Sequence, residues 1–249
     1  MAKWEQHIVE MDNLWLSMRI IRDDHELSTT ANKIKQFQAV YEKVQAATGV
    51  PWQMVAVIHI REAGVQDVGR WKCCLHNGEA IIGTGRRTSL VPAGLGPFAT
   101  WHEAAVNALS REGLIGRATW TPGAILAALE PYNGYGYRQH GLRSPYIWAS
   151  TNHQQPGKYV RDGVFAPDVM DTQVGCAAQL RYLGVTVPEV TTRPLPSKTT
   201  TTAVIVAGGG AVAATKSMGM GWAEAVAIGL AVAIVVVAVF EVVKRWKNK

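Results

Sequence analysis

A glutamate closes an apolar segment in the first quarter of the chain, VPWQMVAVIHIREAG (residues 50–64). A proline in the first turn and a glycine after the last predict a helix between them. At about 100° per residue, Glu62 falls between Val55 and Ile58 on an apolar face, where its pKa should rise. Such a carboxyl can protonate a leaving oxygen, as the general acid does in glycoside cleavage. The alternative is a solvated glutamate paired with Arg61.

A second segment, YNGYGYRQHGLRSPYIW (residues 132–148), combines aromatic rings with glycines and amides. Aromatic faces stack on sugar rings, and glycines let backbone approach a ligand closely. We therefore expect saccharide contacts from Tyr132, Asn133, Tyr135, Tyr137, Tyr146 and Trp148. Cationic side chains that could meet glycan carboxylates are Arg138, Arg143 and Lys158. The alternative is a loop whose aromatic side chains fill the core.

The elements around these segments are predicted to be mostly helical. Apolar spacing, capping residues and closing glycines or prolines predict helices over residues 28–49, 100–113, 121–130 and 168–184. Thr100 and Glu103 form a capping-box pattern at the start of the second of these. The turn sequence His76-Asn77-Gly78, between short apolar runs, predicts a small β-hairpin within residues 72–90.

Charge and cysteine content limit the classes of partner and the disulfide bonds expected for the protein. The formal net charge of +6 favours polyanionic surroundings, namely nucleic acid, anionic lipid or an acidic wall polymer. No helix carries clustered Lys and Arg of the kind that binds a DNA groove, so we expect no nucleic-acid partner. Three cysteines, Cys73, Cys74 and Cys176, give no disulfide framework. The N-terminal segment lacks the apolar stretch of a secretory signal peptide.

The composition changes near the C-terminus. Prolines, threonines and glycines over residues 187–220 predict a linker, within which residues 203–214 could be half of a hairpin or a tether. Residues 221–243 then form an apolar run of about 34 Å as helix, enough to cross a bilayer core of about 30 Å. The basic tail, residues 244–249, predicts a cytoplasmic C-terminus after a transmembrane helix.

Several motifs together resemble a known family. Five segments are similar to phage and prophage muralytic enzymes of the lysozyme-like superfamily, near goose-type lysozymes and lytic transglycosylases. They are HIREAG, CCLHNGEAI, VPAGLGPFATWHEAAVNAL, YNGYGYRQHGLRSPYIWAST and GKYVRDGVF. The resemblance covers roughly residues 50–184. It implies cleavage of the β-1,4 bond between N-acetylmuramic acid and N-acetylglucosamine, with Glu62 as the acid. It also places Asn133 and Gly134 in the sugar cleft. Ala63 departs from the lytic transglycosylases, which usually have serine there.

The sequence offers more than one candidate for a second catalytic carboxylate. A hydrolase needs a base or nucleophile opposite the acid. Glu79 is the first candidate and Asp67 the second. The resemblance to lytic transglycosylases leaves a one-carboxylate mechanism equally open, because there the 6-hydroxyl of the sugar attacks.

Parts of the sequence are compatible with three other functions. A zinc hydrolase would draw on His59, Glu62, Cys73, Cys74, His76 and His102, but no HExxH motif is present. A cysteine amidase would pair Cys73 or Cys74 with His102 or His140, but neither cysteine has the helix N-terminus that would activate it. A catalytically inactive wall-binding or virion protein is the remaining alternative.

The prediction from sequence is therefore an α+β, mainly helical, lysozyme-like domain over residues 1–186 with a small β-hairpin, followed by the linker, the transmembrane helix and the basic tail. We expect no cofactor and no metal. The expected partners are peptidoglycan glycan strands, the bilayer, and other virion or lysis proteins of a phage. The expected location is the inner membrane, with the catalytic domain facing the cell wall or delivered in a phage particle.

Overall fold

The computed structural model describes residues 2–22, 25–161, 163–186, 201–207 and 210–216. The chain divides into two compact units, Met1–Pro188 and Glu189–Lys249. The helices of the first unit are η1 (Lys3–His7), α1 (Ile8–Ser17), α2 (His25–Gln36), α3 (Gln38–Thr48), α4 (Trp52–Ala63), η2 (Val65–Asp67), α5 (Trp101–Arg111), α6 (Pro122–Leu129), η3 (Glu130–Asn133), α7 (Gly136–Gln139), α8 (Pro145–Trp148) and α9 (Cys176–Tyr182). Its strands are β1 (Lys158–Arg161) and β2 (Val164–Ala166). This mainly helical α+β content confirms the predicted fold class at that level.

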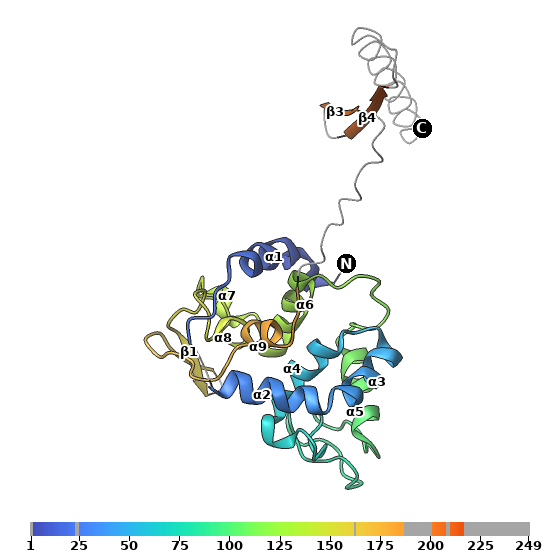
Figure 1. Ribbon diagram of the computed structural model, residues 1–249. Helices are drawn as coiled ribbons and strands as arrows, with labels where there is room; N and C mark the ends of the chain where they lie inside the picture. Colours follow the sequence, from blue (N-terminus) through green and yellow to red (C-terminus); the bar gives the residue numbers. More distant parts are fainter. Residues whose placement is uncertain (1, 23–24, 162, 187–200, 208–209, 217–249) are drawn as a thin grey trace, which may run out of the picture. The chain divides into compact units, whose positions relative to one another are not determined.

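Helix α4 is the central element of the first unit. It packs against α3 on one side and α9 on another, while α1 packs along α6 (Figure 1). Every residue from Met54 to Ile60 is buried. A helix that is apolar on all sides is stable only inside a core. Because α4 runs through the core, the side chain at its C-terminal end is held by its neighbours.

Caps in the structure follow the sequence at two helices. The hydroxyl of Thr100 accepts a hydrogen bond from the backbone N–H of Glu103, as an N-cap of α5. The hydroxyl of Thr121 caps α6 in the same way at Ala124. The carboxylate of Glu103 accepts from the backbone N–H of Ala99 rather than from that of Thr100. Both helices begin where their capping residues predict.

Three predicted elements differ in the structure. The helix expected over residues 28–49 is two helices, α2 and α3, with Phe37 between them in a non-helical conformation. The last helix begins at Cys176 and not at Asp168, because residues 167–175 form a turn, a bend and irregular backbone. Residues 72–90 form turns without strands. The two-stranded sheet of this unit lies instead at β1 and β2, which pair antiparallel with Tyr159 opposite Phe165.

In the second unit, β3 (Thr201–Ala207) and β4 (Gly210–Lys216) pair antiparallel, with Thr201 opposite Lys216 and Ala207 opposite Gly210. A β-hairpin thus occupies part of the predicted linker, since β-branched residues favour extended backbone. Among the described residues, no helix is long and apolar enough to cross a membrane. The predicted transmembrane helix, residues 221–243, and the basic tail lie outside the described residues.

Candidate functional site

Glu62 lies in the last turn of α4 and meets a tyrosine from a distant part of the chain. The hydroxyl of Tyr146, in α8, donates a hydrogen bond to Oε1 of Glu62 over 3.0 Å. Burial raises the pKa of Glu62 to about 7, although the Tyr146 hydrogen bond and the Arg61 charge both act to lower it. The direction of this shift agrees with the prediction from the apolar helix. Near neutral pH both the protonated and the ionised form of the Glu62 carboxyl are therefore populated.

Arg61 fixes the tyrosine that contacts the acid. Its guanidinium carbon lies 4.5 Å from the centroid of the Tyr146 ring, a cation–π arrangement. Nη1 of Arg61 also donates a hydrogen bond to the backbone carbonyl of Val174, just before α9, over 3.0 Å. Arg61 therefore does not form the surface pair with Glu62 that the alternative reading proposed. It holds the ring of Tyr146 and the start of α9 against α4.

A tight turn after α4 packs on the backbone of the acid. The turn is closed by hydrogen bonds from the N–H of Cys74 to the carbonyl of Glu79 and from the N–H of Gly78 to the carbonyl of Cys74. Gly78 has φ +74°, and a Cβ there would overlap the carbonyl oxygen of Glu62. Only glycine meets both requirements without strain. The turn thus packs directly against the C-terminal end of α4.

The two carboxylates predicted as the second catalytic group are both engaged by the protein. Glu79 accepts hydrogen bonds from the N–H and hydroxyl of Ser89, the N–H of Leu90 and the side-chain amide of Asn77. These bonds, that of the Ser89 hydroxyl first, lower the pKa of Glu79. Glu79 therefore ties the turn to residues 89–90. The same bonds explain why residues 72–90 do not form the predicted hairpin: side-chain bonds replace a strand ladder.

Asp67 belongs to a buried polar chain. Nε2 of His59 donates to Oδ2 of Asp67 over 3.0 Å, and Nδ1 of His59 lies 2.9 Å from the hydroxyl of Tyr41. The N–H groups of Lys72 and Cys73 also donate to Asp67. Burial raises the pKa of Asp67, but these hydrogen bonds outweigh it and bring it to about 2. Asp67 is 4% exposed, so its carboxylate anchors the loop and does not face solvent.

A pocket of about 240 Å³ lies beside this turn, and we call it the His76 pocket. Its lining residues are His76, Pro92, Ala108, Arg111, Glu112 and Tyr132. Nε2 of His76 donates to the side-chain oxygen of Asn107, and its ring stacks on Phe98 with centroids 5.5 Å apart. The charges of Glu112 and Glu62 both raise the pKa of Tyr132, after burial, which has the largest effect.

The predicted saccharide contacts do not form one exposed surface. Trp148 is 1% exposed and Tyr137 is 4% exposed, so their rings are core residues and offer no stacking face; that prediction is wrong for both. Tyr146 is also buried, and its hydroxyl serves Glu62. Asn133 is exposed and donates to the hydroxyl of Ser144 over 3.0 Å. Gly134 has φ +70° with open space at its α-carbon.

Two of the three predicted cationic contacts are paired internally. Arg138 makes a bidentate pair with Glu130, at 2.7 and 2.9 Å, and also contacts Glu10. Lys158 lies 2.8 Å from Asp171. Both cations stabilise the fold, which leaves them less available to a glycan carboxylate.

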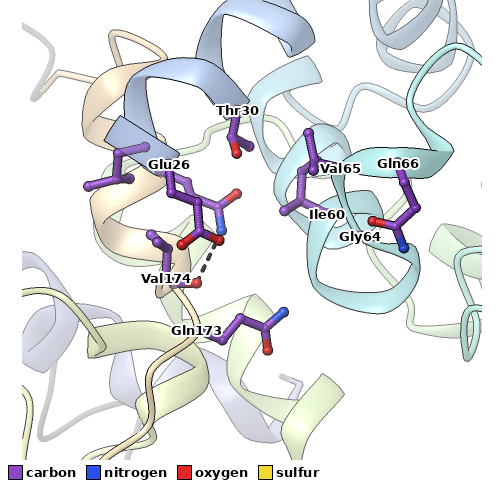
Figure 2. A pocket seen from close by; sticks show the side chains of 10 residues that line it. Glu26, Thr30, Ile60, Gly64, Val65, Gln66, Gln173 and Val174 are labelled. Atoms are coloured by element: carbon purple, nitrogen blue, oxygen red, sulfur yellow. Dashed lines mark hydrogen bonds between the residues drawn. The ribbon is translucent and has the colours of Figure 1, made fainter. Parts of the chain in front are cut away.

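A second pocket, of about 200 Å³, lies between α2, the end of α4 and the segment before α9. Glu26 and Val174 lie on one side of it, and Gly64 and Gln66 on the other (Figure 2). Glu62 does not line this pocket, although Ile60 and Gly64 on either side of it do. The carboxyl of Glu62 is bonded to Tyr146, so this second pocket is separate from the site of the acid.

The residues of the competing readings are dispersed. Among the residues that the structure describes, no three His, Cys, Asp or Glu side chains are placed to hold one metal ion. Burial raises the pKa of Cys73 to about 11, and burial also raises that of Cys74. Cys176 lies buried near Arg61 and Glu62. These thiols lack the lowered pKa of a catalytic cysteine.

The sequence did not indicate that Arg61 and Tyr146 would act on Glu62 together; the only signal was the position of Arg61 beside the acid. Comparison with known proteins adds no assignment: no family model, no curated protein and no solved structure matches the chain.

Proposed function

We propose that this protein cleaves the β-1,4 glycosidic bond of peptidoglycan between N-acetylmuramic acid and N-acetylglucosamine, with Glu62 as the general acid. One observation carries the proposal: a carboxyl whose pKa is about 7 sits at the end of a buried helix and is held by the hydroxyl of Tyr146. General acids of glycoside cleavage have a raised pKa of this kind. The resemblance of residues 50–184 to lysozyme-like muralytic enzymes supplies the substrate and the lysozyme-like fold.

In this mechanism Glu62 is protonated when the glycan binds and gives its proton to the oxygen that leaves the anomeric carbon. The carboxylate that results is stabilised by the hydrogen bond from Tyr146 and by the nearby charge of Arg61. Both interactions favour the charged form, so they strengthen as the proton departs. The raised pKa keeps the proton available, and the two partners limit the cost of losing it.

The decisive experiment compares full-length wild type with Glu62→Gln on purified sacculi. Loss of turbidity and mass spectrometry of the released muropeptides should show glycan cleavage by wild type and a fall of about 10²–10⁴-fold in the variant. Glu42→Gln, on the exposed face of α3, is the matched control and should leave the rate unchanged. A wild type that binds sacculi without releasing fragments would favour an inactive wall-binding protein.

We also propose that residues 221–243 cross the inner membrane, with the C-terminus in the cytoplasm and the catalytic domain facing the cell wall. The apolar run and its basic tail support this orientation. Protease added to spheroplasts should degrade the domain. A domain protected from that protease until the membrane is broken would contradict the orientation.

A further inference from the structure

The pocket of about 200 Å³ between α2, the end of α4 and α9, which we call the Thr30 pocket, contains two buried polar groups without a partner. Gln179 is 4% exposed and Thr30 is 7% exposed. No described residue donates a hydrogen bond to Oε1 of Gln179. Its Nε2 donates to the carbonyl of Val174 over 3.2 Å, which fixes the amide with Oε1 as the unused acceptor. The hydroxyl of Thr30 likewise has no hydrogen bond to any residue that the structure describes.

These two groups indicate that something else satisfies them. Buried polar side chains in folded proteins are almost always hydrogen-bonded, because an unpaired one loses its bonds to water and gains nothing in return. A threonine within a helix commonly bonds a carbonyl one turn back, and Thr30 does not. Figure 2 shows its side chain pointing away from α2, into the space between Val174 and Ile60. Both groups therefore offer hydrogen bonds to a molecule in the pocket.

The Thr30 pocket lies on the opposite face of α4 from the acid. Ile60 lines the pocket, and Glu62 follows it by two residues. At about 100° per residue, the two side chains leave the helix in nearly opposite directions. Glu62 points toward Tyr146, and neither of these residues lines the pocket. A molecule bound here therefore occupies a second site and leaves the acid accessible.

The charges around the Thr30 pocket favour a neutral ligand. Glu26 lines the pocket, so an anion would lie against a carboxylate. Arg61 donates to the carbonyl of Val174, which also lines the pocket, so a cation would lie close to a guanidinium group. A neutral ligand avoids both repulsions.

The lining of the pocket further selects an acetamido group. Oε1 of Gln179 can only accept, so the ligand must donate to it, whereas the hydroxyl of Thr30 can donate to the ligand. The aliphatic side chains of Leu27, Ile60 and Val174 supply an apolar surface. An acetamido group carries an N–H, a carbonyl oxygen and a methyl group, one for each of these three features, and a sugar hydroxyl lacks the methyl group. The pocket volume equals that of roughly six waters, at about 30 Å³ each, so it admits this group with part of a sugar ring.

We propose that the Thr30 pocket is a second glycan-binding site, which takes the acetamido group of an N-acetylated hexosamine; that this sugar belongs to a glycan strand of the cell wall rests on the proposed function. The N–H of the acetamido group donates to Oε1 of Gln179, its carbonyl accepts from the hydroxyl of Thr30, and its methyl group packs against Ile60. The site holds the domain on the wall through a contact that is separate from the bond cleaved at Glu62.

The first test compares three sugars on the full-length wild-type protein in detergent. The probes are the methyl β-glycosides of N-acetylglucosamine, glucosamine and glucose, which differ only at the 2-substituent. Saturation-transfer NMR should show binding of the first alone, with its acetyl methyl protons more strongly saturated than its ring protons. The same sugar should shift the side-chain amide resonances of Gln179. Equal binding of the glucoside, or a shift at the Glu62 carboxyl with none at Gln179, would overturn the proposal.

The second test uses two variants of neighbouring threonines. Thr30→Val replaces the hydroxyl by a methyl group of similar size and should weaken binding of methyl N-acetyl-β-glucosaminide by roughly 2- to 10-fold, the effect of one hydrogen bond. Thr29→Val is the matched control, since Thr29 is exposed on the same helix and does not line the pocket, and its affinity should equal that of wild type. Wild-type affinity in a folded Thr30→Val variant would overturn the proposal, and the wild-type measurements at Gln179 decide the matter if that variant does not fold.

Failure of this proposal is distinguishable from failure of the proposed function. Cleavage of sacculi by a wild-type protein in which the sugar leaves the resonances of Gln179 unchanged would overturn the second site and leave Glu62 as the acid. Binding at Gln179 by a wild-type protein that releases no muropeptides would support the acetamido site and refute glycan cleavage.

Discussion

Replacing Tyr146 by Phe tests how the acid is tuned. The change removes only the hydroxyl that donates to Oε1 of Glu62 over 3.0 Å, and it keeps the ring on which Arg61 stacks. A hydrogen bond to a charged group contributes about 1.5–3 kcal/mol, and one pKa unit equals about 1.4 kcal/mol. Because the bond favours the carboxylate, its loss should raise the pKa of Glu62 from about 7 by roughly one to two units.

The assay is the pH dependence of glycan cleavage. The alkaline limb of kcat/KM reports the loss of the proton from the acid in the free enzyme, so it should move to higher pH by roughly one to two units in Tyr146→Phe. Carbon-13 NMR of the Glu62 side chain should show the same shift without any turnover. Tyr182→Phe, in α9, is the control and should leave the limb in place. A limb that stays fixed or moves to lower pH in Tyr146→Phe would refute this account of the acid.

Three further predictions concern stability. The pKa of Glu62 is about 7 in the folded protein and about 4.5 in the unfolded chain, so the free energy of unfolding should fall as pH rises from 4.5 to 7. Urea unfolding should therefore find Glu62→Gln more stable than wild type by about 3 kcal/mol at pH 8 but not at pH 4. The fold lowers the pKa of Asp67 from 3.8 to about 2, so Asp67→Asn should lower the free energy of unfolding by about 2 kcal/mol at pH 7. The difference from wild type should shrink as pH falls through about 2. An unchanged urea midpoint at pH 7 would contradict a stabilising role of the buried polar chain. Gly78→Ala should lower both the thermal midpoint and the cleavage rate more than Gly85→Ala, which has a similar positive φ but open space, and equal effects would show that contact with Glu62 is unimportant.

The core helix and its acid were predictable from local sequence. The apolar run before Glu62, bounded by Pro51 and Gly64, specifies a buried helix without knowledge of its neighbours. The same run predicts the desolvation that raises the pKa of Glu62. The caps at Thr100 and Thr121 are equally local, since each hydroxyl bonds a backbone N–H three residues ahead. These features need only short-range information.

The loop after α4 was not predictable, because distant side chains decide its conformation. His76-Asn77-Gly78 is a turn in the structure, as its sequence indicates, but Glu79 bonds residues ten and eleven positions ahead in place of a second strand. The burial of side chains in the aromatic segment, residues 132–148, was not predictable either. Trp148 has the residue type of a sugar platform, and only the packing of α8 into the core reveals that its face is covered.

The two candidates for a second carboxylate, Glu79 and Asp67, show the same dependence on distant partners. Acids in loops beside the predicted acid attract attention, yet a loop needs partners for its backbone N–H groups, and nearby carboxylates are the strongest acceptors available. Glu79 and Asp67 serve that structural need.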